Sequence, residues 1–184
     1  MQIIIGLGNP GDNYAQTRHN TGWLALDYLA GSNDWHLEKK FNAMIKQSGD
    51  RLYLKPQTFM NNSGESVYKA LSFYHLLAKQ FIGRTKKDQD LSDTVFVIHD
   101  DLDLDLGAWK ISGDSRSAGH RGVQSIINHL KTKNFTRLRL GIKTSLLRQP
   151  IPPEKFVLQR FDRAELDTLK NTFEPSLKAL EKLI

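Results

Sequence analysis

Three polar segments of the sequence contain residue types that could carry out hydrolytic chemistry. They run from Gly6 to Gly22, from Lys55 to Gly64 and from His99 to Asp103, and each comes after a stretch with the pattern of a strand. A histidine such as His19 can take a proton from water, and a carboxylate such as Asp100 can fix its tautomer and orientation. Asparagine amides add uncharged donors and acceptors that suit an ester or amide substrate. The segments predict a water-activating site with His19 and Asp100 as its candidate pair.

Simpler interpretations of the same residues stay open at this level. A lone loop histidine is more often solvated or structural than catalytic, and the acidic run at residues 100–105 is typical of a solvated turn or a magnesium site.

The stretch 6–11 also matches the G-x-G-x-x-G fingerprint of dinucleotide-binding folds. In that fingerprint a helix begins at the glycines and an acid-terminated strand follows about 20 residues on, and this chain has neither pattern. A nicotinamide-dependent oxidoreductase is therefore disfavoured.

The elements that must position these residues alternate between strands and helices. This order predicts an α/β fold in one domain, with a twisted, mixed and mostly parallel sheet and helices on both faces. Because ligands bind at the carboxyl ends of strands in such sheets, the loops after residues 6, 98 and 112 are expected to meet at one site. Strands are expected at residues 2–6, in a 42–55 hairpin, and at 94–98, 107–112 and 136–142, and helices from about residues 21, 63, 120 and 163.

Finer signals accompany these elements. Ser63 is expected to cap its helix, Asp162 and Glu165 to form a capping pair, and Pro175 to break or restart the last helix. The alternation over 136–142 predicts a half-exposed strand with a basic outer face. The polar stretch 79–93 is expected to be an exposed loop.

Composition excludes several classes of protein. The 184 residues contain no cysteine, so disulfide scaffolds, thiol chemistry and cysteine-ligated metal sites are ruled out. Hydrophobic residues make up 39% and charged residues 25%, as in a folded domain. No apolar run reaches the ~20 residues of a membrane span, and no signal-peptide pattern is present. We therefore expect one soluble, intracellular domain over residues 1–184.

The charge distribution favours a polyanionic partner. The formal net charge is +6 and the isoelectric point is about 9.5. Within residues 107–148, Asp114 is the single acid. The nine basic residues of that stretch are Lys110, Arg116, Arg121, Lys131, Lys133, Arg137, Arg139, Lys143 and Arg148. A basic face beside a carboxylate-rich segment suits an enzyme that acts on a molecule with a phosphate backbone.

Six blocks of the sequence, in order, resemble bacterial-type peptidyl-tRNA hydrolases. They read GLGNPG at 6–11, YxxTRHNTGW at 14–23, KPxTFMNxSG at 55–64, HDDLD at 99–103, SAGHxG at 117–122 and RLRLGI at 137–142. The resemblance implies a monomeric, cytoplasmic α/β domain that cleaves the ester between a peptide and the 3′ end of tRNA. Such an enzyme recycles tRNA from peptidyl-tRNAs dropped by ribosomes. The resemblance implies no metal, no cofactor, no membrane contact and no obligate protein partner.

The resemblance also assigns roles to residues by matching position. His19 would be the general base that activates water, and Asp100 would orient it. Asn9 would sense the peptide, and separate blocked from free aminoacyl-tRNA. The remaining expected contacts are Phe59, Met60 and Asn61 with the peptide and terminal adenosine, Tyr14 with the tRNA end, Arg139 with an acceptor-stem phosphate, and Lys110 near it.

Two features depart from the family pattern. Arg121 stands where the family usually has an asparagine that contacts the tRNA end and a water. An arginine cannot accept a hydrogen bond, but it can donate to a carbonyl or bind a phosphate, so Arg121 stays a candidate for tRNA binding. The neighbouring His120 is expected to order its loop rather than act as a base. The 79–93 stretch is longer than the expected connector, and its simplest interpretation is a tolerated surface insertion.

The leading hypothesis is a peptidyl-tRNA hydrolase. The alternative is a catalytically weakened relative that binds RNA without cleaving it, with Arg121 marking the change. The presence of His19, Asp100, Asn9 and Asn61 together argues against that alternative, because a binding module has no need for the set.

Overall fold

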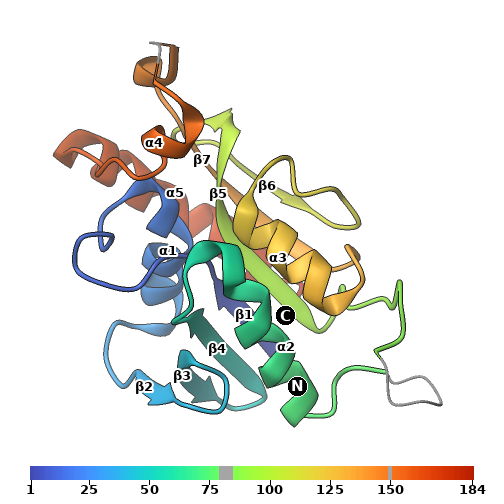
Figure 1. Ribbon diagram of the computed structural model, residues 1–184. Helices are drawn as coiled ribbons and strands as arrows, with labels where there is room; N and C mark the ends of the chain where they lie inside the picture. Colours follow the sequence, from blue (N-terminus) through green and yellow to red (C-terminus); the bar gives the residue numbers. More distant parts are fainter. Residues whose placement is uncertain (79–84, 149–150) are drawn as a thin grey trace.

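A seven-stranded mixed sheet forms the centre of the computed structural model, which describes residues 1–78, 85–148 and 151–184. The strand order is β2-β3-β4-β1-β5-β7-β6 (Figure 1). The four middle strands run parallel: β4 (Arg51–Pro56), β1 (Gln2–Gly6), β5 (Val95–Asp105) and β7 (Thr136–Lys143). The outer strands pair antiparallel: β2 (His36–Glu38), β3 (Ala43–Ser48) and β6 (Trp109–Ser112).

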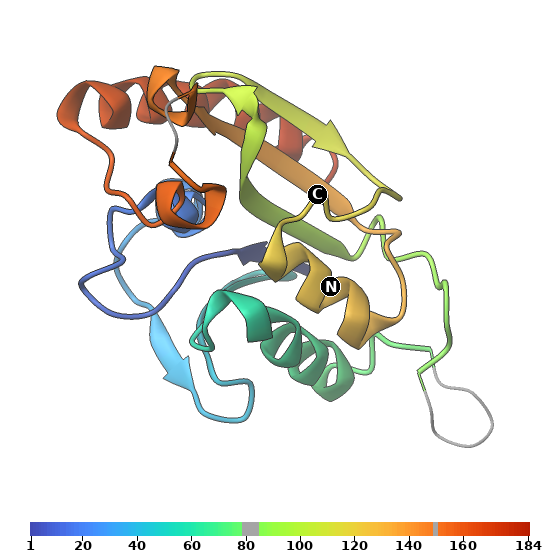
Figure 2. The ribbon, with the colours of Figure 1, turned by 45° about the horizontal axis from the view of Figure 1, so that its top comes forward.

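Helices cover both faces of this sheet (Figures 1 and 2). Successive residues of a strand point to opposite faces. Ile3 and Ile5 of β1 therefore pack with α2 (Ser63–Phe73) and α3 (Arg121–Leu130), whereas Ile4 packs with α1 (Thr21–Ala30) and α5 (Arg163–Glu181). Short helices complete the chain: η1 (Arg18–Asn20), η2 (Met60–Asn62), η3 (Ser145–Arg148) and α4 (Pro153–Phe156). The α/β class with helices on both faces is confirmed.

Local sequence signals are confirmed at the β3–β4 turn and at the start of α5. The β3–β4 hairpin turns at Gly49, which has a φ of 57° that suits glycine. Asp162 and Glu165 form a full capping box at the start of α5. The prediction for Ser63 is wrong in detail: Asn62 is the N-cap residue, and the Ser63 hydroxyl donates to the Met60 carbonyl instead.

The largest difference concerns the acidic run at 100–105, which is strand rather than loop. β5 continues to Asp105 because β7 pairs with it beyond residue 98. Two carboxylates of the run meet basic side chains of β7: Asp101 pairs with Arg139, and Asp105 with Lys143. Cross-strand pairs of opposite charge stabilise a ladder that the sequence of β5 alone would not favour.

Two further predictions are wrong. β7 is not half-exposed: the Arg137 side chain is only 2% exposed and lies within the fold. α5 continues through Pro175, because Phe173, Leu177 and Leu180 on either side of it are buried in the core. The burial of these side chains outweighs the hydrogen bond that a proline cannot donate.

The predicted loop at 79–93 is described only from residue 85 onward. The described part contains no helix or extended strand, but it is not fully exposed: Leu91 is 3% exposed and packs in the core. Across the three described ranges, no helix combines the length and apolar character needed to cross a membrane.

Candidate functional site

The candidate site lies where the carboxyl end of β1, the middle of β5 and the start of α3 meet. Close packing of α1 on the sheet creates this meeting point. A Cβ added at Gly22 would lie 2.3 Å from the Ile98 carbonyl oxygen and 2.5 Å from the Leu7 amide nitrogen. Glycine at position 22 thus allows the first turn of α1 to touch β1 and β5, and this brings the preceding η1 beside β5.

Buried contacts with the C-terminal part of the chain also hold η1, which carries His19. The Arg18 guanidinium donates to both carboxylate oxygens of Glu165 in α5, at 2.7 and 2.9 Å, and lies over the rings of Phe156 and Phe161. The amide of His19 donates to the Val157 carbonyl at 2.8 Å. The orientation of His19 therefore depends on the C-terminal part of the chain.

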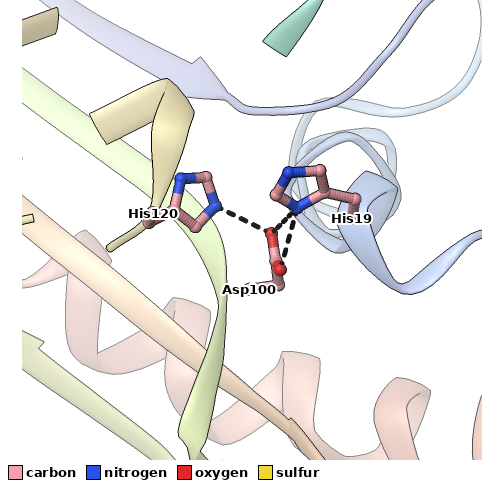
Figure 3. A group of neighbouring side chains, drawn as sticks. All are labelled: His19, Asp100 and His120. Carbon is pink, nitrogen blue, oxygen red and sulfur yellow. Dashed lines mark hydrogen bonds and ion pairs between the residues drawn. The ribbon is translucent and has the colours of Figure 1, made fainter. Parts of the chain in front are cut away.

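His19, Asp100 and His120 form a compact group (Figure 3). His19 Nδ1 lies 3.0 Å from both carboxylate oxygens of Asp100, and His120 Nε2 lies 2.9 Å from Asp100 Oδ1. Asp100 is only 2% exposed. Burial by itself would raise its pKa, but attraction to His19 and His120 and their hydrogen bonds hold that pKa below its usual range. Asp100 therefore stays a carboxylate, which can only accept hydrogen bonds.

These contacts fix the tautomers of both histidines. Because the carboxylate accepts from His19 Nδ1, this nitrogen carries the hydrogen, and Nε2 keeps a lone pair for a proton. His120 is the N-cap of α3, and its Nδ1 accepts from the Val123 amide at 3.3 Å. Its hydrogen is then on Nε2, which donates to Asp100. The loop-ordering role expected for His120 is present, together with a contact to Asp100 that the sequence did not indicate.

His99, next along β5, is a buried neighbour of the group. Its Nδ1 donates to the Asp100 carbonyl oxygen at 2.7 Å, and its buried Nε2 has no hydrogen-bond partner among the described residues. Burial, followed by repulsion from His120, lowers the pKa of His99 to about 3. This ring is therefore neutral, and adds no positive charge beside Asp100.

A network of two asparagines holds Asn9, which lines the same cleft as His19. The Asn20 side chain accepts from the Asn9 amide at 2.9 Å and donates to the Asn9 carbonyl at 3.0 Å. Asn9 Oδ1 in turn accepts from the Met60 amide at 2.8 Å, which joins the loop after β1 to η2. Asn9 Nδ2 is the group that this residue can still offer to a ligand as a donor.

A cleft of about 1060 Å³ contains the group. Nine of the ten predicted site residues line it: Asn9, Tyr14, His19, Phe59, Met60, Asn61, Asp100, Arg121 and Arg139. Phe59 is 58% exposed, and its ring meets that of Tyr14 edge-on, with the centroids 6.3 Å apart. Lys110 is the exception: it lies on β6 opposite Arg139 and does not line the cleft.

The basic residues around the cleft differ in what they can do. Arg137 is buried and structural: it donates to the carbonyls of Ser115, Arg116 and Lys133, so it holds the loop before α3. Burial, with repulsion from Arg139, lowers its pKa to about 10, so it remains a cation. Arg139 donates through Nε to Asp101 and lines the cleft. The side chain of Arg148 lies outside the described residues.

Comparison with known proteins identifies the family. The family model described as peptidyl-tRNA hydrolase matches residues 3–184. The chain belongs to the peptidyl-tRNA hydrolase family. It is 39% identical over 178 residues to the peptidyl-tRNA hydrolase of Mycoplasma capricolum, covering 94% of this chain and 87% of the relative. The corresponding protein of Lactobacillus gasseri is 35% identical, over 100% of this chain and 93% of the relative.

The fold agrees with this membership. A crystal structure of peptidyl-tRNA hydrolase from Acinetobacter baumannii superposes with a TM-score of 0.82 at 28% identity, and covers 100% of this chain and 88% of that one. The α/β architecture described above is thus that of the peptidyl-tRNA hydrolases, and the resemblance seen in the sequence blocks is confirmed.

Sequence reasoning missed three contributors to the site. The contact of His120 with Asp100 spans 20 residues, and the Asn20 bonds to Asn9 span 11. The pairing of Asp101 with Arg139 depends on the register of β5 and β7. A useful signal for His120 was its position directly before an amphipathic helix, where a side chain can both cap the helix and reach a neighbouring strand.

Proposed function

We propose that this protein hydrolyses the ester between a peptide, or an N-blocked aminoacyl group, and the 3′ end of tRNA, and so recycles the tRNA. The observation that carries the proposal is His19 Nδ1 at 3.0 Å from both Asp100 oxygens inside the cleft, with Nε2 left as a base. Family membership supplies the substrate class. The working form that we propose is a cytoplasmic monomer that needs no protein partner, cofactor or metal.

The proposed reaction follows from the tautomer of His19. His19 Nε2 takes a proton from water while the water oxygen attacks the ester carbonyl carbon. Asp100 stabilises the imidazolium that forms, because its carboxylate already accepts from Nδ1. When the tetrahedral intermediate collapses, the bond to the ribose oxygen breaks, and the proton on Nε2 passes to that oxygen. The products are a free carboxylic acid and tRNA.

Amide donors near the base complete the proposed chemistry. Asn9 Nδ2 and the Asn61 side chain border the same cleft as His19, so they are the candidates to donate to the oxyanion or to the peptide backbone. Asn9 is held rigidly through Met60 and Asn20, and a preorganised donor loses little entropy when it binds. We assign the peptide and the terminal adenosine to Phe59, Met60 and Asn61.

The acceptor stem is proposed to lie along the basic side of the cleft. Arg139 and Arg121 border the cleft and would contact phosphates, and Tyr14 would contact the tRNA end. Lys110 is exposed on β6 beside Arg139, outside the cleft, where it could contact a phosphate farther along the stem. Contacts of this kind make tRNA affinity fall steeply as salt increases.

The direct test is release of a labelled N-blocked aminoacyl group from its tRNA, beside the same tRNA with a free amino group. The protein is expected to cleave the blocked substrate selectively. His19→Ala should lose about 10²-fold or more in rate and keep tRNA binding, whereas His36→Ala, at an exposed position on β2, should be unaffected. If the unmutated protein binds tRNA and cleaves neither substrate, the weakened RNA-binding relative becomes the correct description.

A further inference from the structure

The group at the centre of the cleft also has the donor set of a transition-metal site. His19, Asp100 and His120 each offer one ligand atom, and within the described residues these atoms all lie within 4.8 Å of one another. Imidazole nitrogens and carboxylate oxygens are ligands of Zn²⁺, and three protein ligands plus one water is a common arrangement for it. The geometry points to a site for one Zn²⁺ ion that, when filled, switches the hydrolase off. The inhibition, though not the binding, rests on the proposed function.

Two of the three ligand separations fit a zinc ion after small movements, and the third must shorten further. Ligands bound at about 2.0–2.2 Å in a tetrahedron lie about 3.3 Å from one another. Asp100 Oδ1 is already 3.0 Å from His19 Nδ1 and 2.9 Å from His120 Nε2. Both separations need to change by only about 0.3–0.4 Å to reach the tetrahedral value. The third separation, between the His19 and His120 nitrogens, is within 4.8 Å and must shorten toward about 3.3 Å. The two imidazole rings, with centroids 4.9 Å apart, flank the same carboxylate and can close this separation by turning toward a shared ion.

The surroundings favour an ion at this point. The carboxylate of Asp100 is almost fully buried, so water screens its charge weakly. The open cleft gives an ion a path to it, since all three ligand residues line that cleft. The Asp100 backbone is fixed by the pairing of β5 with β7 and by the hydrogen bond that its carbonyl accepts from His99. Among the residues that the structure describes, four arginines border the cleft. Arg116 and Arg121 are exposed to solvent, which weakens their repulsion. Arg139 is paired with Asp101, and Arg137 donates to backbone carbonyls.

Zinc binding would disable the base by moving its proton. The ion takes the lone pair of His19 Nδ1, so the hydrogen on Nδ1 moves to Nε2, and Nε2 can no longer accept a proton from water. In His120 the hydrogen on Nε2 moves to Nδ1, which then cannot accept from the Val123 amide. The charge of the protein is unchanged by these two tautomer shifts, and the ion adds +2. Metal binding is thus coupled to loss of the α3 cap.

Binding can be measured separately from catalysis. Metal-free wild type, His120→Asn and His36→Asn are titrated with ZnCl₂ in competition with a chromophoric chelator, and with Co²⁺ while its visible absorption is recorded. Asparagine is a favourable N-cap, so His120→Asn keeps α3 capped and removes one ligand. We expect one Zn²⁺ per wild-type chain with a tetrahedral Co²⁺ spectrum, the same for His36→Asn, and at least tenfold weaker binding for His120→Asn. Asp100→Asn serves as a second ligand variant, and circular dichroism checks the fold of each.

Catalysis is then compared between metal-free protein and protein loaded with one equivalent of Zn²⁺ and freed of excess metal by gel filtration. Release of the labelled N-blocked aminoacyl group should fall at least tenfold on loading, and recover with EDTA. Equal zinc affinity in wild type, His120→Asn and Asp100→Asn would overturn the site. Undiminished or faster hydrolysis by the loaded protein would overturn the inhibition. A metal-free wild type that cleaves nothing would instead refute the proposed function, and the binding comparison would still decide the metal site.

Discussion

His99→Asn should remove a pH dependence of stability that the fold creates. The folded pKa of His99 is lowered to about 3, mainly by burial, whereas an unfolded histidine titrates near 6.5. As the pH falls below 6.5, the unfolded chain gains a proton that folded His99 does not accept. Wild-type stability is therefore fully present above pH 6.5 and is lost as the pH falls toward 3. The loss approaches about 1.4 kcal/mol per pH unit, and amounts to about 2–3 kcal/mol between pH 7.5 and pH 4.5.

Asparagine suits this test because its amide can still donate to the Asp100 carbonyl, as His99 Nδ1 does. The smaller side chain lowers stability by a similar amount at every pH. The informative quantity is therefore the slope of the free energy of unfolding against pH. Urea unfolding, followed by tryptophan fluorescence at fixed ionic strength from pH 4.5 to 7.5, gives the free energy of unfolding. The wild type should lose about 2–3 kcal/mol more than His99→Asn between pH 7.5 and pH 4.5, and His36→Asn should follow the wild type. Parallel curves for wild type and His99→Asn would refute the reasoning.

Four further changes test other parts of the structure. Asp100→Asn should lower hydrolysis about 10²–10⁴-fold with tRNA binding kept in a filter assay, because the carboxylate that holds the base is lost; a parallel loss of tRNA binding would contradict this. Gly22→Ala should cost about 1–3 kcal/mol of stability, seen as a lower Tm, since its Cβ would lie 2.3 Å from the Ile98 carbonyl oxygen; an unchanged Tm would disprove the close packing. Arg139→Gln should reduce the slope of log KM against log salt by about one, and an unchanged slope would remove Arg139 from the phosphate contacts. Arg121→Asn should keep or increase turnover, because an amide both donates and accepts; a collapse would show that the arginine has a role of its own.

Local patterns in the sequence were sufficient for the fold class and for most of the strands and helices. Alternation of apolar runs with amphipathic segments predicted the α/β sheet, and the capping pair at Asp162 and Glu165 marked the start of α5. These signals are reliable because the physical causes, side-chain periodicity and helix capping, act within a few residues. The pairing of His19 with Asp100 was a candidate on chemical grounds, and the contact itself joins residues 81 apart.

Tertiary structure alone decided the details of the site. Only the register of β5 with β7 turns the acidic run into strand and sets Asp101 against Arg139. Only the packing of α3 on the sheet brings His120 to Asp100, and makes one residue both a helix cap and a partner of the carboxylate. The burial of Arg137 could not be predicted from the sequence either, because alternation along a strand assigns side chains to faces of the sheet but does not show what covers each face. The sequence by itself determined which groups could do the chemistry, and long-range packing determined which of them meet.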